Sequence, residues 1–207
     1  MKTNTLIRWG GLSALVASIV SIAIEVARIA TIGNQAYSIA ALTTEWSVLY
    51  IFRLAAVILL MLGLVALFAR QSQKMGTFGV IAFVIAAIGT MLIFGFAWAL
   101  TFAFPAMAES VPEFLDAHAT APSAGVVLSL FLVTIGWLLF GVASLRAKVL
   151  PAGSSWVVIA GSFLALVLNI LSVPMSWLIF DVGVIWMGWW LWKEHTFPTQ
   201  ENLAGSQ

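Results

Sequence analysis

The sequence predicts an all-α membrane protein: a polytopic bundle of six transmembrane helices with both termini on the cytoplasmic side. The first observation is composition, because 62% of the 207 residues are hydrophobic and only 8% are charged. Soluble domains carry about 25% charged residues, and disordered chains carry little apolar surface, so both classes are excluded. The second observation is a series of long apolar runs. The third is the uneven distribution of lysine and arginine between the segments that join them.

The apolar runs predict helices rather than the strands of a barrel. About 20 apolar residues are needed to cross the hydrocarbon core as a helix, and only helices or closed barrels satisfy the backbone in lipid. Barrel strands alternate apolar and polar residues, whereas these runs are continuous. The predicted helices lie at about residues 6–30, 47–69, 77–102, 123–145, 154–171 and 175–192. We expect residues 1–207 to form a single membrane domain, with a short polar cytoplasmic tail at 193–207.

The fifth and sixth predicted helices are obtained by dividing one long apolar run. The stretch 149–192 is too long for one span, and Ser172-Val173-Pro174 divides it. Proline has no N–H for a helix interior and suits a helix start. Because the turn is short, we expect the fifth and sixth helices to form a tight hairpin.

Orientation follows from the basic residues, which are enriched on the cytoplasmic side of membrane proteins. Seven of the nine would lie on one side of this arrangement and two, Arg28 and Arg53, on the other. The seven are Lys2, Arg8, Arg70, Lys74, Arg146, Lys148 and Lys193. Both termini are therefore predicted to be cytoplasmic. Tryptophans near the helix ends, Trp46 on the outer side among them, are expected to anchor the chain at the membrane surface.

The outer segment 105–122 is predicted to carry a short interfacial helix or lid. Ser110-x-x-Glu113 has the spacing of a capping box, and Phe114 and Leu115 are expected to lie on the membrane surface. Glu109, Glu113, Asp116 and His118 match no strong metal-ligand spacing. We therefore interpret them as a solvated acidic loop, without a metal.

Small residues recur on several of the predicted helices, where they permit close helix packing. They are Gly10 and Gly11 on the first helix, Gly79, Ala86 and Gly89 on the third, and Gly136 and Gly141 on the fourth.

Four ionisable residues form a predicted charge layer in the outer third of the bilayer. Glu25 and Arg28 lie on the first helix, Arg53 on the second and Asp181 on the sixth. Glu25, Arg53 and Asp181 lie roughly 10 Å from the outer helix ends, and Arg28 is shallower. Each such charge costs about 2.5–3.5 kcal/mol to insert, so the four must face the bundle interior or water and pair. The neighbouring polar side chains assigned to the same layer are Asn169 and Tyr50.

Two interpretations of this charge layer remain. In one, the arginines clamp the acids and lock three helices together without chemistry. In the other, the layer lines a cavity open to the outside that binds a small polar ligand or relays protons. We predict that a carboxylate oxygen of Glu25 or Asp181 approaches the guanidinium of Arg53 or Arg28 across helices, directly or through one water.

The residue types exclude most catalytic chemistries. The chain has no cysteine, and its two histidines, His118 and His195, lie outside the apolar runs. Neither H-E-x-x-H nor a nucleotide-binding P-loop is present. We therefore predict no catalytic residue, no metal and no cofactor, and an enzyme is the less favoured class. With a net charge of +1 and no basic tract, nucleic acid is not an expected partner. The expected partners are the lipid bilayer, another membrane protein or a second copy, and a small polar ligand.

Two segments resemble known membrane proteins. The basic turn with Leu-Pro and a following aromatic helix start, at residues 145–156, and the tryptophan-rich last helix, at residues 185–190, resemble families of uncharacterised six- to seven-span bacterial proteins. This resemblance implies a bacterial cytoplasmic membrane and supplies no functional residues. The architecture is also similar to the substrate-capture subunits of energy-coupling-factor transporters. The expected function is binding or transport of a small polar molecule through an outward-facing site; the alternative is a non-catalytic accessory subunit.

Overall fold

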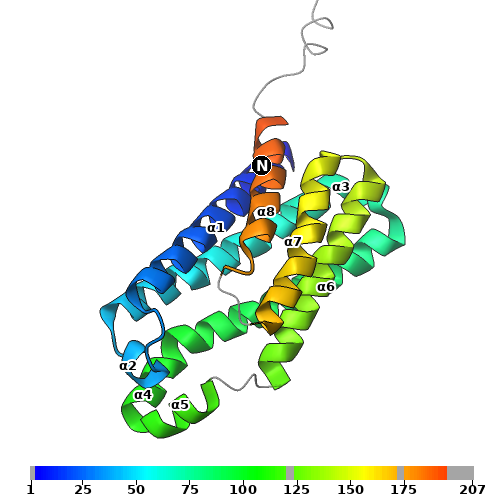
Figure 1. Ribbon diagram of the computed structural model, residues 1–207. Helices are drawn as coiled ribbons and strands as arrows, with labels where there is room; N and C mark the ends of the chain where they lie inside the picture. Colours follow the sequence, from blue (N-terminus) through cyan, green and yellow to red (C-terminus); the bar gives the residue numbers. More distant parts are fainter. Residues whose placement is uncertain (1–2, 120–123, 172–174, 195–207) are drawn as a thin grey trace, which may run out of the picture.

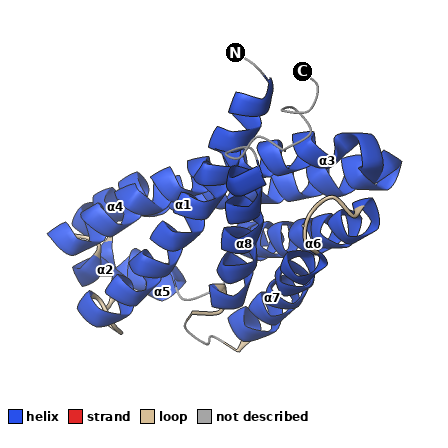
Figure 2. Cartoon of the chain, turned by 90° about the horizontal axis from the view of Figure 1, so that it is seen from above, coloured by secondary structure: helices blue, strands red, loops and turns tan. Residues whose placement is uncertain are grey.

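The computed structural model describes residues 3–119, 124–171 and 175–194, and within these ranges it contains helices and loops but no strand (Figures 1 and 2). The predicted all-helical class is therefore confirmed. The helices are α1 (Thr3–Thr31), α2 (Tyr37–Ala40), α3 (Thr44–Trp98), the π-helix η1 (Ala99–Ala103), α4 (Phe104–Ser110), α5 (Pro112–Ala119), α6 (Ala124–Ala147), α7 (Ala152–Ile170) and α8 (Leu178–Glu194). The predicted turn at residues 172–174 lies outside the described residues.

Helix α3 is broken at Gly76 into two helices that fold back on each other. Gly76 has φ 59° and ψ −166°, a conformation that essentially only glycine adopts. Near the break, the rings of Phe68 and Phe83 stack with centroids 4.2 Å apart. At the far end, Thr101 Oγ1 donates to the carbonyl oxygen of Tyr50 at 3.1 Å. The two halves, residues 44–75 and 77–98, therefore run antiparallel along their whole length.

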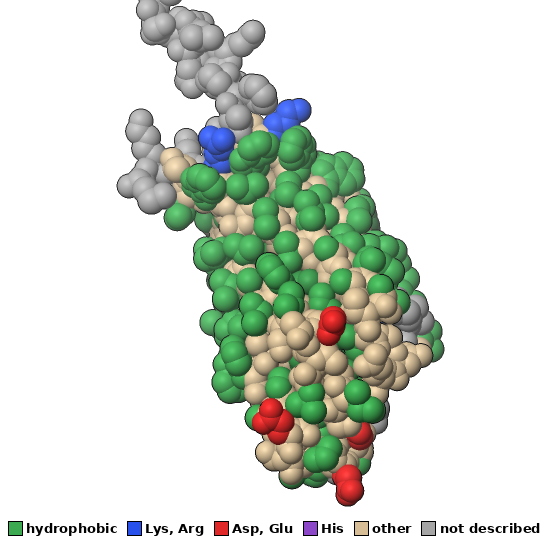
Figure 3. Space-filling view, turned by 90° about the vertical axis from the view of Figure 1, so that its left-hand side faces the viewer, with side chains coloured by type: hydrophobic (Ala, Val, Ile, Leu, Met, Phe, Trp, Pro, Cys, Tyr) green, Lys and Arg blue, Asp and Glu red, His purple; other side chains and the backbone are tan. Residues whose placement is uncertain are grey.

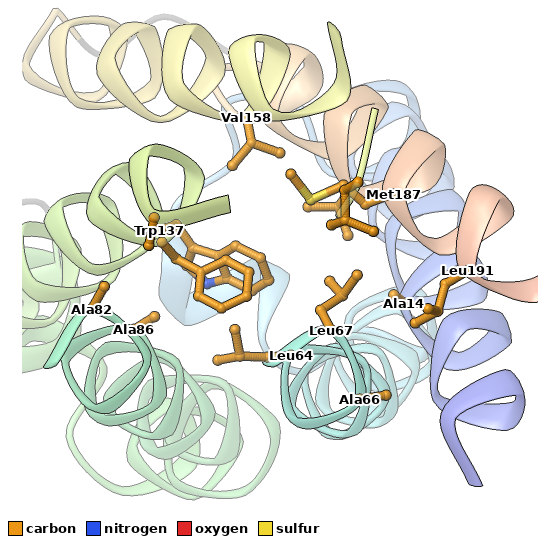
Figure 4. Close-up of a cluster of buried hydrophobic side chains, with 14 of the residues drawn as sticks. Ala14, Leu64, Ala66, Leu67, Ala82, Ala86, Trp137, Val158, Met187 and Leu191 are labelled. Atoms are coloured by element: carbon orange, nitrogen blue, oxygen red, sulfur yellow. The ribbon is translucent and has the colours of Figure 1, made fainter. Parts of the chain in front are cut away.

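The long helical segments form a closed ring in chain order. The first half of α3 packs on α1, the second half packs on α6, and α7 and α8 complete the circuit back to α1. Figure 4 looks into this ring and shows side chains from every side converging on its centre. Up-and-down connection through short turns produces this order, because consecutive antiparallel helices become neighbours.

Glycines set the closest approaches between the helices of the ring. A Cβ added to Gly89 or Gly136 would overlap the backbone of the facing helix, at Val133 and Ala86 respectively. A Cβ on Gly11 would lie 3.0 Å from the carbonyl oxygen of Gly188. The predicted close packing is confirmed at these positions. Gly79 differs, because its nearest neighbour is Met75, on the other side of the break in α3.

The centre of the ring is an apolar core. Trp137 of α6, Leu64 and Leu67 of α3 and Met187 of α8 are fully buried there (Figure 4). Phe140 of α6 is fully buried in the same cluster. The indole N–H of Trp137 has a hydrogen-bond partner in this core, since Nε1 donates to Thr90 Oγ1 at 3.2 Å.

A small cap of α2, α4 and α5 lies at the end of the molecule opposite the N-terminus of α1 and is joined to α3 through η1 (Figure 1). The third predicted helix does not end at residue 102: it continues through η1 and α4 to Ser110. Ser110 is thus the last residue of α4, and α5 begins at Pro112. Of the two residues expected on the membrane surface, Phe114 is exposed, but Leu115 is only 2% exposed and packs inside the cap. The prediction for Leu115 is therefore wrong, because the cap has an apolar core of its own.

The surface is consistent with a membrane-embedded protein. Figure 3 shows basic side chains at one end, acidic side chains toward the other and a broad apolar band between them. Among the described residues, four helical stretches are long and apolar enough to cross a membrane: Thr5–Thr31, Thr44–Ser110, Ala124–Ala147 and Ala152–Asn169. The second of these contains the break at Gly76.

Candidate polar site between α1, α3 and α8

One face of α1 carries four polar side chains in succession. Ser18, Ser21, Glu25 and Arg28 are spaced three, four and three residues apart, and this spacing places them on a single helix face. Arg53 of α3 and Asp181 of α8 approach the same face from the two helices that flank α1. We call these six residues the polar site.

Glu25 and Arg28 form an ion pair within α1. Arg28 Nη2 lies 2.7 Å from Glu25 Oε1, and Arg28 Nε donates to Oε2 at 3.3 Å. The Glu25 side chain is 24% exposed and the Arg28 side chain is 31% exposed. Two N–H donors on one carboxylate form the strong, bidentate kind of charge pair, so Arg28 is the direct charge partner of Glu25, with Arg53 of α3 also within electrostatic range.

Arg53 reaches α1 through a hydroxyl instead of a carboxylate. Its Nη1 donates to Ser21 Oγ at 3.1 Å. The guanidinium is also within electrostatic range of Glu25 and Asp181. Ser21 therefore forms a direct hydrogen bond between α1 and the first half of α3, which corresponds to the second predicted span.

Asp181 approaches Ser21 from α8, the other helix that flanks α1. Its side chain is buried in the first turn of α8, 5% exposed, and the hydroxyls of Ser18 and Ser21 face its carboxylate. Within the described ranges, Glu25–Arg28 is the only ion pair with an N–O distance of 4.0 Å or less. The direct form of the expected contact between a carboxylate and a guanidinium of different helices is thus absent there, and Ser21 lies between Arg53 and Asp181.

The other two predicted members of the layer have different partners. Asn169 donates through Nδ2 to Ser176 Oγ at 2.9 Å and to the carbonyl oxygen of Ala165 at 2.8 Å, so it joins the end of α7 to the start of α8. The Tyr50 ring packs on Trp46, with centroids 4.3 Å apart, while lying within electrostatic range of Arg28 and Arg53. Tyr50 thus borders the polar site, whereas Asn169 braces the α7–α8 connection.

Asp116 lies in helix α5 and forms hydrogen bonds to α2, whereas the sequence predicted a solvated loop at this position. It accepts hydrogen bonds from the backbone N–H and the hydroxyl of Ser38, at 2.9 and 2.6 Å. These hydrogen bonds hold the pKa of the Asp116 carboxyl below its usual value. No local sequence signal marks the pair, because the two residues are 78 positions apart. Nothing is described for the side chain of His118.

Trp46 also departs from its predicted role as a surface anchor. It is 1% exposed, and its Nε1 donates to the carbonyl oxygen of Leu100 at 2.8 Å. Leu100 lies in the π-helix η1, where the changed hydrogen-bond pattern leaves backbone carbonyls available. Trp46 therefore joins the first half of α3 to η1.

A separate open cavity of about 370 Å³ lies on the surface of the cap, away from the polar site. It is lined by Ser110, Val111, Pro112, Glu113 and Phe114.

Comparison with known proteins supplies no further assignment: no family model, curated protein or solved structure matches the chain.

Proposed function

We propose that the chain is a membrane protein that binds a small polar molecule at the polar site, from the outer side, for uptake or sensing. The observation that carries the proposal is the arrangement around Ser21. A cation, Arg53, and a buried acid, Asp181, face one hydroxyl from two different helices and are not closed into a direct pair. Charged groups inside a membrane domain are costly, and residues that bear them commonly line ligand or ion pathways.

The proposed membrane arrangement has six spans, with both termini in the cytoplasm of a bacterium. The two halves of α3 count as separate spans, and α8 as the sixth. The segregation of charge supports this orientation. Arg8, Lys74 and Lys193 lie at the end where α1 starts and α8 finishes, and the acidic residues Glu45 and Glu113 lie at the cap. The basic end is expected to be cytoplasmic.

Single cysteines test the orientation, because the natural chain contains none. Gln73→Cys and Glu113→Cys place exposed thiols near the break in α3 and on the cap. In intact cells an impermeant maleimide should label the Glu113→Cys protein and not the Gln73→Cys protein. Labelling of both variants from outside would contradict the proposed arrangement.

Ligand binding is tested by thermal unfolding of the purified chain in lipid nanodiscs against a panel of small polar metabolites. A ligand that binds only the folded state raises the unfolding temperature, Tm. We expect at least one compound to raise Tm for the natural chain and for Lys74→Gln, an exposed control at the basic end, but not for Arg53→Gln. If no compound raises Tm, or if Arg53→Gln responds like the natural chain, binding at the polar site is refuted.

The alternative, an accessory subunit whose charges only lock helices together, is favoured by one observation. Glu25 and Arg28 already form a complete pair on a single helix. This alternative predicts that Arg53→Gln changes stability without changing any response to small molecules.

A further inference from the structure

We propose that the start of α1 and the end of α8 together bind the phosphodiester group of one anionic phospholipid, phosphatidylglycerol in the test below. We call this surface, formed by Arg8 of α1 with Trp189, Trp192 and Lys193 of α8, the basic seam. Arg8 lies roughly 25 Å along α1 from Glu25, so the inference does not depend on ligand binding at the polar site.

Close packing of α1 on α8 brings the two helix ends together (Figure 1). A Cβ added to Gly11 would lie 3.1 Å from the backbone nitrogen of Trp192. One turn earlier on α1, the guanidinium carbon of Arg8 lies over the Trp192 ring, 5.8 Å from its centroid. An arginine within about 6 Å of a tryptophan ring is attracted to its face. The ring therefore holds this guanidinium at the boundary between the two helices.

The Arg8 guanidinium keeps its capacity to bind an anion. Among the described side chains, no carboxylate oxygen lies within 4.0 Å of it. A guanidinium has five N–H donors in a planar fork that matches a phosphate group. Lys193, the exposed residue that follows Trp192, adds a second cation to the end of α8. The basic seam thus presents two cations from two helices.

The charge of the two helix ends matches a single phosphodiester. Residues 3–10 and 187–194 contain Arg8, Lys193 and one acid, Glu194, so their formal sum is +1. The phosphodiester of phosphatidylglycerol carries one negative charge and neutralises this sum. A phosphatidylethanolamine headgroup adds an ammonium group, which the two cations repel. The seam should therefore favour a lipid whose net charge is negative.

The aromatic surroundings suit a lipid better than a free phosphate. The rings of Trp189 and Trp192 lie 5.4 Å apart, and Trp189 is exposed. On α1, Leu6 and Trp9 are exposed on either side of Arg8. Tryptophan favours the level of the lipid headgroups, and these apolar surfaces can contact acyl chains. A general excess of cations at one end of the molecule orients the chain, but it does not require an arginine held on a ring between two helices.

The experiment measures Tm of the full chain in phosphatidylcholine nanodiscs that contain increasing fractions of phosphatidylglycerol. A lipid that binds the folded state raises Tm. We expect Arg8→Gln and Lys193→Gln each to need about 5-fold more phosphatidylglycerol for half of the rise. Arg146→Gln is the matched control, because Arg146 also lies over a ring, 4.7 Å from the centroid of Phe78. The control should respond like the natural chain. Equal losses in Arg8→Gln and Arg146→Gln would indicate diffuse attraction and overturn the inference.

Trp192→Leu tests the positioning of Arg8 without altering any charge. We expect this variant to lose most of its response to phosphatidylglycerol. Each variant is compared with itself in pure phosphatidylcholine, so a change in its basal stability does not affect the result. Trp156→Leu is the control, because Trp156 is an exposed tryptophan near the start of α7. A Trp192→Leu protein that responds like the natural chain would overturn the inference.

Two further arms identify the occupant. Phosphatidylethanolamine in place of phosphatidylglycerol, and glycerol 3-phosphate added to phosphatidylcholine nanodiscs, should both leave Tm unchanged. A rise equal to that with phosphatidylglycerol in either arm would contradict an anionic lipid as the occupant. Arg53→Gln should keep the full response to phosphatidylglycerol, so a failure of the function proposed for the polar site is distinguishable from a failure of this inference.

Discussion

Asp116 of α5 accepts two hydrogen bonds from Ser38 of α2, one from the backbone N–H and one from the hydroxyl. This pair ties together two segments of the cap that are far apart in the chain.

Replacing Asp116 by alanine should lower Tm by about 2–4 °C, because the two donors of Ser38 lose their acceptor. Asp116→Asn should cost less, since one amide oxygen remains to accept. Glu113→Gln, an exposed position on the same helix, is the control and should leave Tm unchanged. Equal Tm values for Asp116→Ala and Glu113→Gln would show that the bond does not stabilise the cap.

The same carboxylate predicts a pH dependence. Its pKa is lowered in the folded protein, so its contribution to stability is present above the unfolded-state pKa of about 4 and is lost as pH falls through the folded-state value. The Tm difference between the natural chain and Asp116→Asn should therefore be constant near neutral pH and shrink in acid below about pH 4. A difference that grows in acid would contradict this assignment.

Gly76→Ala should destabilise the chain by about 1–3 kcal/mol, because φ 59° and ψ −166° are strained for any residue with a Cβ. No atom lies within 4 Å of the Cβ position, so the cost is conformational and not steric. Gly95 is the matched control: it also has open space around its Cβ position but is helical. Gly95→Ala should be neutral or stabilising by up to about 1 kcal/mol. Unfolding by detergent titration compares the two, and equal effects would refute the conformational explanation.

Gly136→Ala should be destabilising for a different reason. Its Cβ would overlap the backbone of Ala86, so α6 and the second half of α3 would have to separate. Overpacking of this kind costs about 1–3 kcal/mol. Gly95→Ala again serves as the control, and a Gly136→Ala protein as stable as the natural chain would mean that the two helices have room to move apart.

Arg53→Ala should reduce the free energy of unfolding by about 1–3 kcal/mol, because it removes the cation near the buried carboxylate of Asp181 and leaves that carboxylate without a nearby positive charge. Adding Asp181→Asn should recover part of that loss, since the acid that was stranded is then neutral. The double-mutant cycle measures this coupling. Additive effects of the two substitutions would show that Arg53 and Asp181 do not interact.

The helical membrane class follows from composition and from the lengths of the apolar segments alone. In lipid the backbone N–H and C=O groups must hydrogen-bond to one another, and a helix meets this requirement over any apolar stretch of sufficient length. The sequence also predicted a turn between residues 69 and 77, which the structure narrows to Gly76, and small residues at close helix contacts, since both depend on local residue type. The predicted charge layer placed Glu25, Arg28, Arg53 and Asp181 at one depth by counting along helices. Counting along a helix does not specify which neighbours a side chain meets.

The tertiary structure decided those neighbours. The order of helices around the ring sets Ser21 between Arg53 and Asp181. Folding of the cap buries Leu115 and Trp46 and brings Asp116 to Ser38. Each of these contacts depends on the distance between segments far apart in the chain. That distance is set by the packing of whole helices, and no short stretch of sequence encodes it.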